Sequence, residues 1–368
     1  MMSSLTSAQP PSTYKALFFE SASIDPTVAS LPTPKPDPGT VIVRPLYSWV
    51  YGYAGDIFTN GNPRNYPVSF PLTGGGNAIG RVAAVPPEAK NLKVGALVVV
   101  DPIIKERDSS AHHLSDFRAI GISDNGTWAE LVKAPIENVL RIDEAALERN
   151  GIPIRDAAFY AQLVVPYGGL RDVKLIAGET VLISPATGNF GGAAVHVALA
   201  MGAGRVVAMG RNEKILAELK ALAPGKVETV VFSGSVEADV ASIAKYGPVD
   251  VFLDLTPPMA KNTSHIQAGI MSMRPKGRVS MMGNVNALEI PYRLVAFRGL
   301  RLQGTEMYTR EQAMDMLKLI ETGTLKTGPE AGLVTKGVFK LEDGLAALEF
   351  AAKEAGAGRA VYFAPNEE

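Results

Sequence analysis

Hydrophobic residues follow one pattern before about residue 156 and another after it. In the first part, short apolar runs of strand type are separated by turn-forming segments such as PTPKPDPG (32–39) and NGNPRNYP (60–67). The predicted strands are 14–20, 40–50, 78–85, 95–102 and 127–135. Short strands separated by Gly, Pro and Asn are typical of antiparallel sheets. We therefore predict a mostly β domain over residues 1–156.

From residue 157 apolar strands alternate with helices that have one apolar face. The predicted strands are 179–186, 205–210, 229–232, 249–255 and 277–283, and the predicted helices are 157–174, 191–203, 212–222, 236–247 and about 261–273. A last helix from Thr309 to about Gly323 and a strand at 358–365 follow. This alternation predicts a doubly wound parallel sheet over 157–324, so the fold class is α/β.

Composition narrows the classes of function. Lys and Arg together number 36 and Asp and Glu 37, a balance that argues against a nucleic-acid partner or a polybasic membrane-binding surface. No apolar run approaches the length of a membrane span, and residues 1–15 lack the pattern of a secretory signal. We expect a cytoplasmic protein that acts on a small molecule.

The chain contains no cysteine, which excludes disulfides, thiolate nucleophiles, iron–sulfur clusters and cysteine zinc sites. Its histidines are His112, His113, His196 and His265, and none has the spacing of a metal-binding pair. We therefore expect no metal. His265 is expected on a helix surface rather than as a proton shuttle.

The strongest chemical signal is the strand, glycine turn and small-residue helix in VLISPATGNFGGAAVHVALA. A dinucleotide pyrophosphate needs backbone N–H groups at a helix N-terminus with no side chain in the way. The usual GxGxxG has Ala186 in place of its first glycine. A tight strand–helix turn without a ligand is the alternative. The candidate cofactor-binding residues here are Thr187, Gly188, Asn189, Phe190 and Gly191.

The next strand ends without the acidic residue that binds the ribose hydroxyls in NAD-dependent proteins. Gly210 is followed by Arg211 and Asn212, with Lys214 one turn later. A guanidinium at this position can bind a 2′-phosphate, so we predict NADPH over NADH. The alternative is that Arg211 only covers the surface.

Further along, three residues follow two later strands of the predicted sheet. Thr256 follows strand 249–255. Gly283 ends strand 277–283, and Asn284 follows it. We expect all three to contact the cofactor.

With these features in place, the chain from about Lys15 to Pro365 resembles the medium-chain dehydrogenase/reductase superfamily, which includes alcohol dehydrogenases and quinone oxidoreductases. The resemblance rests on NLKVGALVVV (91–100), NGTWAELVKAP (125–135), residues 175–203, PKGRVSMMG (275–283), LEDGLAALEF (341–350) and the strand-like segment 358–365. It implies a GroES-like domain that binds the substrate, to which 325–368 return, and a Rossmann domain that binds the cofactor. It also implies a homodimer or homotetramer joined at the Rossmann sheet edge near 298–306.

The resemblance also shows where zinc-dependent members place their catalytic ligands. Gly76 stands at the histidine position and Asn77 at the adjoining glutamate. The first cysteine position falls at Tyr53, or at Gly52 if the loop is shifted by one residue, and the second falls near Tyr160. None of these residues is a good zinc ligand, so we predict a zinc-independent member. The glycines of PLTGGGNAIGRV (71–82) suggest open space beside the nicotinamide.

Without a metal, hydrogen-bond donors must stabilise and protonate the alkoxide or enolate left by hydride transfer. The aromatic loop 49–70 lines the substrate pocket in the family, and Trp49 and Asn77 are expected there. Tyr53 is the first candidate for the proton donor, Tyr66 the second and Tyr160 the third. Each could instead be an apolar wall. Asp56 is expected mainly to hold the loop.

Together these observations predict an NADPH-dependent, zinc-independent oxidoreductase that reduces an activated C=O or a conjugated C=C of a fairly apolar small molecule. A quinone reductase is a close alternative. A catalytically inactive NADPH-binding protein with a structural or regulatory role is another. The sequence leaves open the physiological substrate, the bond reduced and the stereochemistry.

Overall fold

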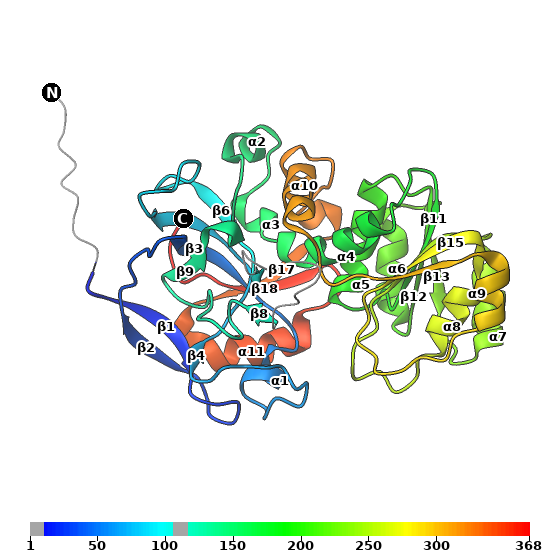
Figure 1. Ribbon diagram of the computed structural model, residues 1–368, viewed down its shortest axis with the longest axis horizontal. Coiled ribbons are helices and arrows are strands. Elements are labelled where there is room, and N and C mark those ends of the chain that lie inside the picture. Colours follow the sequence, from blue (N-terminus) through cyan, green and yellow to red (C-terminus); the bar gives the residue numbers. More distant parts are fainter. Residues whose placement is uncertain (1–10, 106–116) are drawn as a thin grey trace. The chain divides into compact units, whose positions relative to one another are not determined.

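The structure is a computed structural model that describes residues 11–105 and 117–368 (Figure 1). The described chain divides into two compact units. Unit 1 contains the described residues up to Ile142 together with Gly337–Lys353 and Val361–Glu368, and unit 2 contains Asp143–Lys336 and Glu354–Ala360.

The first boundary lies earlier than the predicted 156/157. The backbone N–H of Asp143 donates to Glu321 Oε1 (2.7 Å), and Asn150 Nδ2 donates to the Glu321 carbonyl oxygen (2.8 Å). These bonds tie the segment after Ile142 to the helix that ends at Glu321, so it belongs with unit 2.

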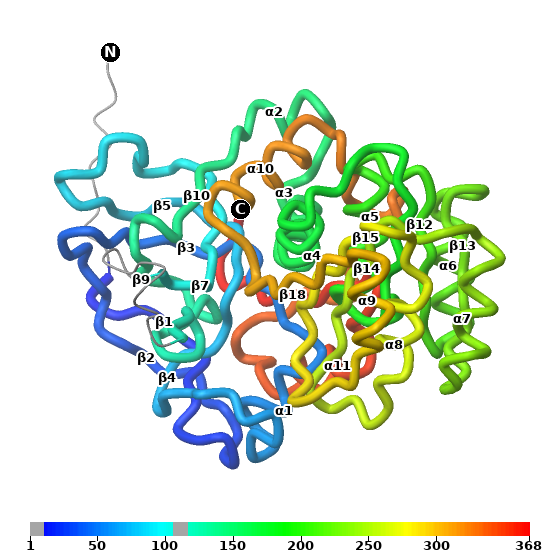
Figure 2. The backbone as a smooth tube through the Cα atoms, turned by 45° about the vertical axis from the view of Figure 1, so that its right-hand side comes forward, coloured from blue at the N-terminus to red at the C-terminus, as the bar shows by residue number. Residues whose placement is uncertain are grey.

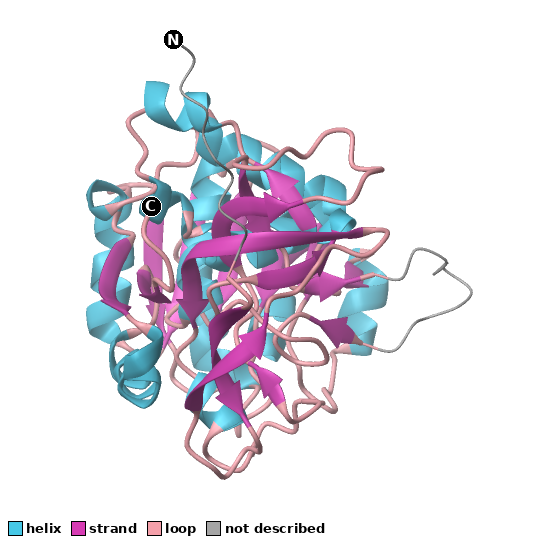
Figure 3. Ribbon diagram, turned by 90° about the vertical axis from the view of Figure 1, so that its left-hand side faces the viewer, coloured by secondary structure: helices cyan, strands magenta, loops and turns pink. Residues whose placement is uncertain are grey.

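Unit 1 consists mainly of antiparallel strands (Figure 3). Its strands are β1 (Thr13–Phe19), β2 (Thr27–Pro32), β3 (Thr40–Val50), β4 (Leu72–Thr73), β5 (Ala78–Ala84), β6 (Leu97–Val100), β7 (Ile103–Ile104), β8 (Arg118–Ala119), β9 (Val132–Pro135) and β10 (Val139–Arg141), with β17 (Val334–Phe339) and β18 (Arg359–Phe363) near the end of the chain. Its helices are α1 (Ala54–Phe58) and α11 (Gly344–Glu354). One sheet has the order β10-β6-β5-β3-β18-β17, and a smaller one has the order β2-β1-β4.

The long strand β3 organises unit 1. It pairs with β5, β9 and β18, all antiparallel, and most of its side chains are buried because sheet partners and core surround it. Figure 2 shows β18 lying along β3, which brings the end of the chain back beside residues 48–50. That return positions the start of the aromatic loop 49–70.

Two strands of unit 1 differ from the prediction. β9 begins only at Val132, because Trp128 and Ala129 bond to β1 by single contacts instead of a continuous ladder. β2 was not predicted, because it has no buried residue and so lacks an apolar pattern.

Unit 2 is an alternation of helices and parallel strands. Its strands are β11 (Thr180–Ser184), β12 (Arg205–Gly210), β13 (Val227–Val231), β14 (Val249–Asp254), β15 (Met273–Met281) and β16 (Arg301–Gly304). Its helices are α2 (Glu144–Arg149), α3 (Ile154–Ala157), α4 (Tyr160–Asp172), α5 (Asn189–Ala200), α6 (Glu213–Leu222), α7 (Val236–Ala244), α8 (Ser264–Met271), α9 (Tyr292–Arg298) and α10 (Arg310–Glu321). The strands lie in the order β13-β12-β11-β14-β15-β16. The order of the strands reverses between β11 and β14, because β12 and β13 lie on one side of this point and β15 and β16 on the other. Ligands bind at such a switch point in open α/β sheets.

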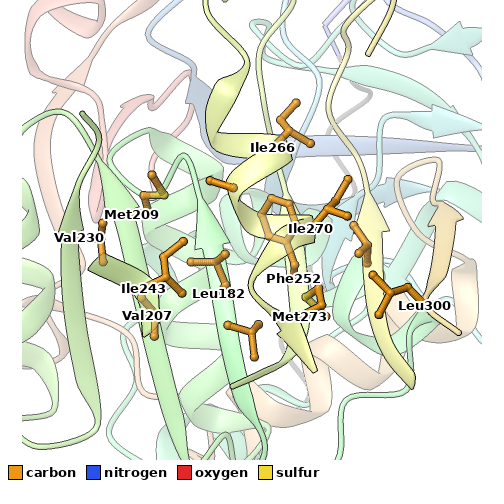
Figure 4. Packing of buried hydrophobic residues seen from close by; sticks show 13 residues of the cluster. Leu182, Val207, Met209, Val230, Ile243, Phe252, Ile266, Ile270, Met273 and Leu300 are labelled. Carbon is orange, nitrogen blue, oxygen red and sulfur yellow. The ribbon is translucent and has the colours of Figure 1, made fainter. Parts of the chain in front are cut away.

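The core of unit 2 packs helices α7 and α8 on one face of this sheet. Leu182, Val207 and Phe252 from the strands meet Ile243 and Ile266 from the helices, and all are fully buried or nearly so (Figure 4). Such a core makes the carboxyl ends of the strands a rigid platform for the loops that follow them.

The helices of unit 2 differ from the prediction in two places. The single helix predicted over 157–174 is interrupted, because Ala158 and Phe159 form tight i→i−3 bonds to Arg155 and Asp156, so α3 and α4 are separate. Helix α9 was not predicted, because none of its residues is buried. Within the described residues, no helix is both long and apolar enough to cross a membrane.

Candidate active site

The turn between β11 and α5 leaves room for a ligand at the helix N-terminus. Gly188 is the N-cap residue, and a side chain added there would meet no atom within 4 Å. In contrast, a Cβ at Gly191 would collide with the Pro185 carbonyl oxygen, so Gly191 is needed for packing. The first N–H groups of a helix have no intrahelical partners and favour an anion. The residues therefore fit a dinucleotide pyrophosphate.

The departure from GxGxxG at Ala186 causes no strain. Ala186 is fully buried, its backbone lies outside the left-handed region, and its N–H donates to the Met209 carbonyl oxygen (2.7 Å). An alanine can adopt this conformation as readily as a glycine. The other predicted residues of the turn, Thr187, Asn189 and Phe190, are half-buried. Within the described chain Asn189 Oδ1 is buried and has no hydrogen-bond partner.

Two cationic side chains are exposed to solvent just after β12. Arg211 and Lys214 are exposed, and neither is in an ion pair with another described residue. Gly210 packs against Thr187, since a Cβ there would lie 2.5 Å from Thr187 Cγ2. Asn212 has a structural role, because its Oδ1 accepts from the Ile215 N–H (3.2 Å) and caps α6. Arg211 and Lys214 are thus the residues here that are available to bind a phosphate.

A buried polar chain links the loops after β14 and β15. The Thr256 hydroxyl contacts Asp254 Oδ1 and lies 2.8 Å from His265 Nε2. The hydroxyl donates its one proton to the carboxylate, so His265 Nε2 carries a proton and donates to the hydroxyl oxygen. The backbone N–H of Gly283 also bonds to Asp254. This chain fixes Thr256 and Gly283 relative to one another.

The structure corrects the expectation for His265. Its side chain is only 6% exposed and packs edge-on against Phe232 (ring centroids 5.2 Å apart), so it is not a helix-surface residue. Burial, together with the nearby Arg211 guanidinium, lowers the pKa of His265 to about 4. Burial raises the pKa of Asp254, although its hydrogen bonds favour the charged form. Asn284 is exposed and donates its N–H to the Thr256 carbonyl oxygen (2.9 Å).

The glycines of PLTGGG do not leave open space, contrary to prediction. A Cβ at Gly74 would lie 2.6 Å from Trp128 Cε3, and one at Gly75 would collide with the same indole. A Cβ at Gly76 would touch Pro102 (3.2 Å). The fully buried Trp128 ring therefore fills the volume that the missing side chains leave, and Gly75 also needs its positive φ of 92°.

The predicted tyrosines of unit 1 form one aromatic cluster. The Tyr53 ring lies 4.8 Å from Tyr51 and 6.3 Å from Tyr66, measured between centroids. Burial, and after it the neighbouring Tyr66 and Tyr51, raise the pKa of Tyr53 well above its ordinary value. Tyr53 is therefore neutral at physiological pH, and its hydroxyl can donate a hydrogen bond.

Asp56, Arg64 and Asn62 hold this cluster in place. Arg64 Nε donates to Asp56 Oδ2 (2.8 Å), and the Arg64 guanidinium lies over the Tyr53 ring (4.7 Å). Asn62 clamps Tyr66, because its Oδ1 accepts from the Tyr66 N–H (3.0 Å) and its Nδ2 donates to the Tyr66 carbonyl oxygen (2.7 Å). Arg64 and Asn62 were not predicted as site residues. Their only signal was the turn chemistry of NGNPRN.

Asn77 and Trp49 meet at the start of the same loop. The backbone N–H of Trp49 donates to the backbone carbonyl oxygen of Asn77 (3.1 Å). The Asn77 side chain takes no part in this bond. Its Nδ2 is buried without a hydrogen-bond partner among the described residues. An unsatisfied buried amide is costly unless a ligand completes it.

Tyr160 belongs to unit 2, whereas Tyr53 and Tyr66 belong to unit 1. It begins α4 and is 1% exposed. His112 and His113 lie outside the described residues. Within the part of the chain that the structure describes, no group of three His, Asp or Glu side chains could hold a metal ion.

Two family models match the chain. The alcohol dehydrogenase GroES-like domain matches residues 37–144, and the zinc-binding dehydrogenase model matches residues 190–322. The chain belongs to the medium-chain dehydrogenase/reductase superfamily. It is an oxidoreductase of that type and uses a nicotinamide cofactor. The predicted GroES-like and Rossmann architecture is confirmed.

Curated relatives and solved structures extend over nearly the whole chain. Acryloyl-coenzyme A reductase of Metallosphaera sedula is 25% identical (86% of this chain, 90% of the relative), and L-threonine 3-dehydrogenase of Thermococcus kodakarensis is 26% identical (91% and 93%). The crystal structure of AibC superposes with a TM-score of 0.79 at 24% identity (97% of each chain). An alcohol dehydrogenase of E. coli in complex with NADH also gives 0.79, at 18% identity (96% and 100%). The two structures show likeness of fold.

Proposed function

We propose that this protein is an NADPH-dependent, zinc-independent reductase of an activated C=O or conjugated C=C in a fairly apolar small molecule. The observation that carries the proposal is the tyrosine cluster around Tyr53, a residue that the family resemblance aligns with a metal-ligand position. By the resemblance, Tyr53 (or Gly52, if the loop is shifted by one residue) stands at the first cysteine position; its ring lies 6.3 Å from the Tyr66 ring, and burial raises its pKa above the ordinary value. A protonated phenol can supply the hydrogen bond and the proton that a metal-free reduction needs.

The preference for NADPH rests on the charge at the end of β12. Arg211 and Lys214 are exposed cations without an ion-pair partner among the described residues, and no carboxylate stands where the ribose hydroxyls would need one. An arginine fork binds phosphate oxygens bidentately, whereas a carboxylate would repel them. Gly188 and the α5 N-terminus would hold the pyrophosphate, and Gly191 lets the start of α5 pack against Pro185.

The independence from zinc rests on the residues at the ligand positions. The chain has no cysteine, and glycine, asparagine and tyrosine occupy the positions that carry ligands in zinc-dependent members. Zinc sites need thiolate, imidazole or carboxylate donors. One of the two matching models is nevertheless named for zinc binding, which makes metal analysis essential.

In this proposal the bound NADPH supplies a hydride. The chain's own residues bind the substrate beside Trp49 and Asn77 and place its oxygen near the Tyr53 hydroxyl. Tyr53 then gives its proton to the developing oxyanion, with Tyr66 as the neighbouring donor and Tyr160 as a third candidate. Asp56 positions Arg64 over the Tyr53 ring. The relatives' names cover both a C=C reductase and a C–OH dehydrogenase, so both bond types stay within the proposal.

We also propose a cytoplasmic homodimer or homotetramer joined at the edge of the parallel sheet. β16 is the last strand of that sheet, and three of its four residues are exposed. Tyr292 and Phe297 on the preceding helix are 78% and 83% exposed. Open strand edges and exposed aromatic side chains favour association. Sedimentation velocity should give an oligomer that Phe297→Asp dissociates. A wild-type monomer at all concentrations would contradict this.

The activity is tested by following NADPH oxidation against a panel of aldehydes, quinones, enones and cyclic imines. The expected result is turnover of an aldehyde or an enone with NADPH, at a kcat/KM well above that with NADH. Preferred turnover of quinones would favour the quinone reductase. Tight NADPH binding with no turnover of any class would favour the inactive NADPH-binding protein.

A further inference from the structure

Unit 2 contains a hollow lined by residues other than those of the glycine turn 187–191. It lies between α5, α6 and the segments 332–334 and 357–359, and has a volume of about 280 Å³. Its apolar lining is Ile215, Leu219, Leu222, Gly332, Val334 and Ala357. Ala357 packs so closely on Gly192 of α5 that a Cβ on Gly192 would collide with it. We call it the α5–α6 pocket.

His196 is the polar group of this pocket. It lies about two turns into α5 and is only 8% exposed, yet it forms no hydrogen bond with another described residue. Its Cε1 faces Gly332 on the opposite wall, where an added Cβ would lie 3.8 Å away. Its ring nitrogens are not among the fully buried atoms, so they reach the pocket and can hydrogen-bond to a ligand there.

The charge state of His196 selects the kind of ligand. Burial lowers the pKa of His196 to about 4, so the ring is neutral at pH 7 and offers one donor and one acceptor. The charged residues at the mouth neutralise one another, because Arg359 Nη2 lies 2.6 Å from Glu218 Oε2. An apolar pocket with a neutral hydrogen-bonding group and a paired rim favours an uncharged ligand.

We propose that the α5–α6 pocket binds an uncharged compound of one or two rings with a single hydroxyl or amide head. The head hydrogen-bonds to His196, and the rings lie on Leu219 and Leu222. A volume of about 280 Å³ is near the lower end of small-molecule sites, which suits a ligand of this size. The pocket continues into a wider hollow that shares His196, so a ligand can enter from solvent.

The test uses 2-naphthol as the probe and the full-length protein. Spectra of protein labelled with ¹³C at histidine Cε1 should show the His196 resonance moving as 2-naphthol is added, with a Kd below about 1 mM, while His265 stays in place. Leu219→Trp, which fills the pocket, should abolish the shift. Val231→Trp, which adds the same side chain at an exposed position, should leave it unchanged.

Two further variants test the hydrogen bond itself. His196→Leu should weaken 2-naphthol binding about five- to tenfold, because it removes one neutral hydrogen bond. His196→Gln, which keeps a donor and an acceptor, should largely preserve the affinity. The charged analogue 2-naphthoate should bind more weakly than 2-naphthol. No movement of His196, binding that survives Leu219→Trp, or tighter binding of 2-naphthoate would overturn the proposal. None of these measurements requires turnover, so their outcome is independent of the proposed activity.

Discussion

Thr256 Oγ1 lies 2.8 Å from His265 Nε2 and contacts Asp254 at the same time. The three side chains are almost fully buried, at 1%, 6% and 2% exposure, so no solvent replaces a lost partner. Through Asp254 the chain also reaches the backbone of Gly283. The Thr256 hydroxyl thus joins Asp254 to His265, and Asp254 in turn contacts Gly283 in the loop after β15.

Thr256→Val should reduce the free energy of unfolding by about 1–3 kcal/mol and weaken NADPH binding, because it leaves Asp254 and His265 without their shared partner. The control is Thr335→Val, since the Thr335 hydroxyl is buried without a hydrogen-bond partner among the described residues. Urea unfolding and fluorescence titration with NADPH measure both effects. Equal loss of stability in the two variants would show that the polar chain contributes nothing.

Arg211→Ala should raise the Kd for NADPH about 10- to 100-fold, the range expected for a lost charged hydrogen bond of about 1.5–3 kcal/mol. The Kd for NADH should change less than twofold, because NADH has no 2′-phosphate. Arg293→Ala, an exposed arginine on α9, is the matched control and should change neither constant. Equal weakening of both cofactors would show that Arg211 does not discriminate between them.

Gly188→Ala and Gly191→Ala should separate ligand binding from packing. At Gly188 the added methyl meets no protein atom and the backbone has a φ of −94°, so stability should hold or rise by about 0.4–1 kcal/mol. NADPH affinity should fall at least tenfold, because the methyl occupies the space of the pyrophosphate. Gly191→Ala should instead destabilise the fold, since its Cβ would strike the Pro185 carbonyl oxygen. If Gly188→Ala bound NADPH normally, the open space would not be the phosphate site.

Acid should destabilise the protein between about pH 6.5 and pH 4 through His196 and His265. Burial depresses the pKa of both rings to about 4, so they stay neutral in the native state while the unfolded chain takes up protons near pH 6.5. The free energy of unfolding therefore falls as the pH drops through this window, by at most about 1.4 kcal/mol per pH unit for each histidine. The raised pKa of Asp254 acts in the opposite direction, because it makes the native state bind a proton more readily as the pH falls. Comparing histidine variants is therefore more informative than the pH dependence of the wild type alone.

The measurement is urea unfolding at several pH values for wild type and His196→Gln. The variant should show a slope smaller by nearly one proton in this window. An unchanged slope would mean that His196 titrates normally in the native state.

The sequence predicted the fold well where burial produces a regular apolar pattern. β11, β12 and β14 are buried on both faces, and their bounds follow the apolar runs closely. β2 and α9 have no buried residue, so no pattern indicated them. The break between α3 and α4 depends on local bonds at Ala158 and Phe159, which no periodicity shows.

The candidate site was likewise predictable only where the signal is local in the sequence. The glycine turn and Arg211 were visible because their spacing is local. What fills the space beside Gly74 is Trp128, more than fifty residues away in the sequence, so the glycines alone suggested a void. The burial of His265 likewise depends on Phe232 and Thr256, which come from other elements. Arg64 and Asn62 act through contacts to side chain and backbone that only the folded loop creates.

In the proposed function a protonated Tyr53, and not a metal ion, assists the reduction. The most direct measurement is kcat/KM for NADPH-dependent reduction of the best substrate, after chelation and with the zinc content determined in the same samples. Wild-type enzyme with far less than one zinc per chain should keep its full activity, and Tyr53→Phe should lose at least about 100-fold. Loss of wild-type activity on chelation with recovery on adding zinc, or full activity of metal-free Tyr53→Phe, would contradict the account.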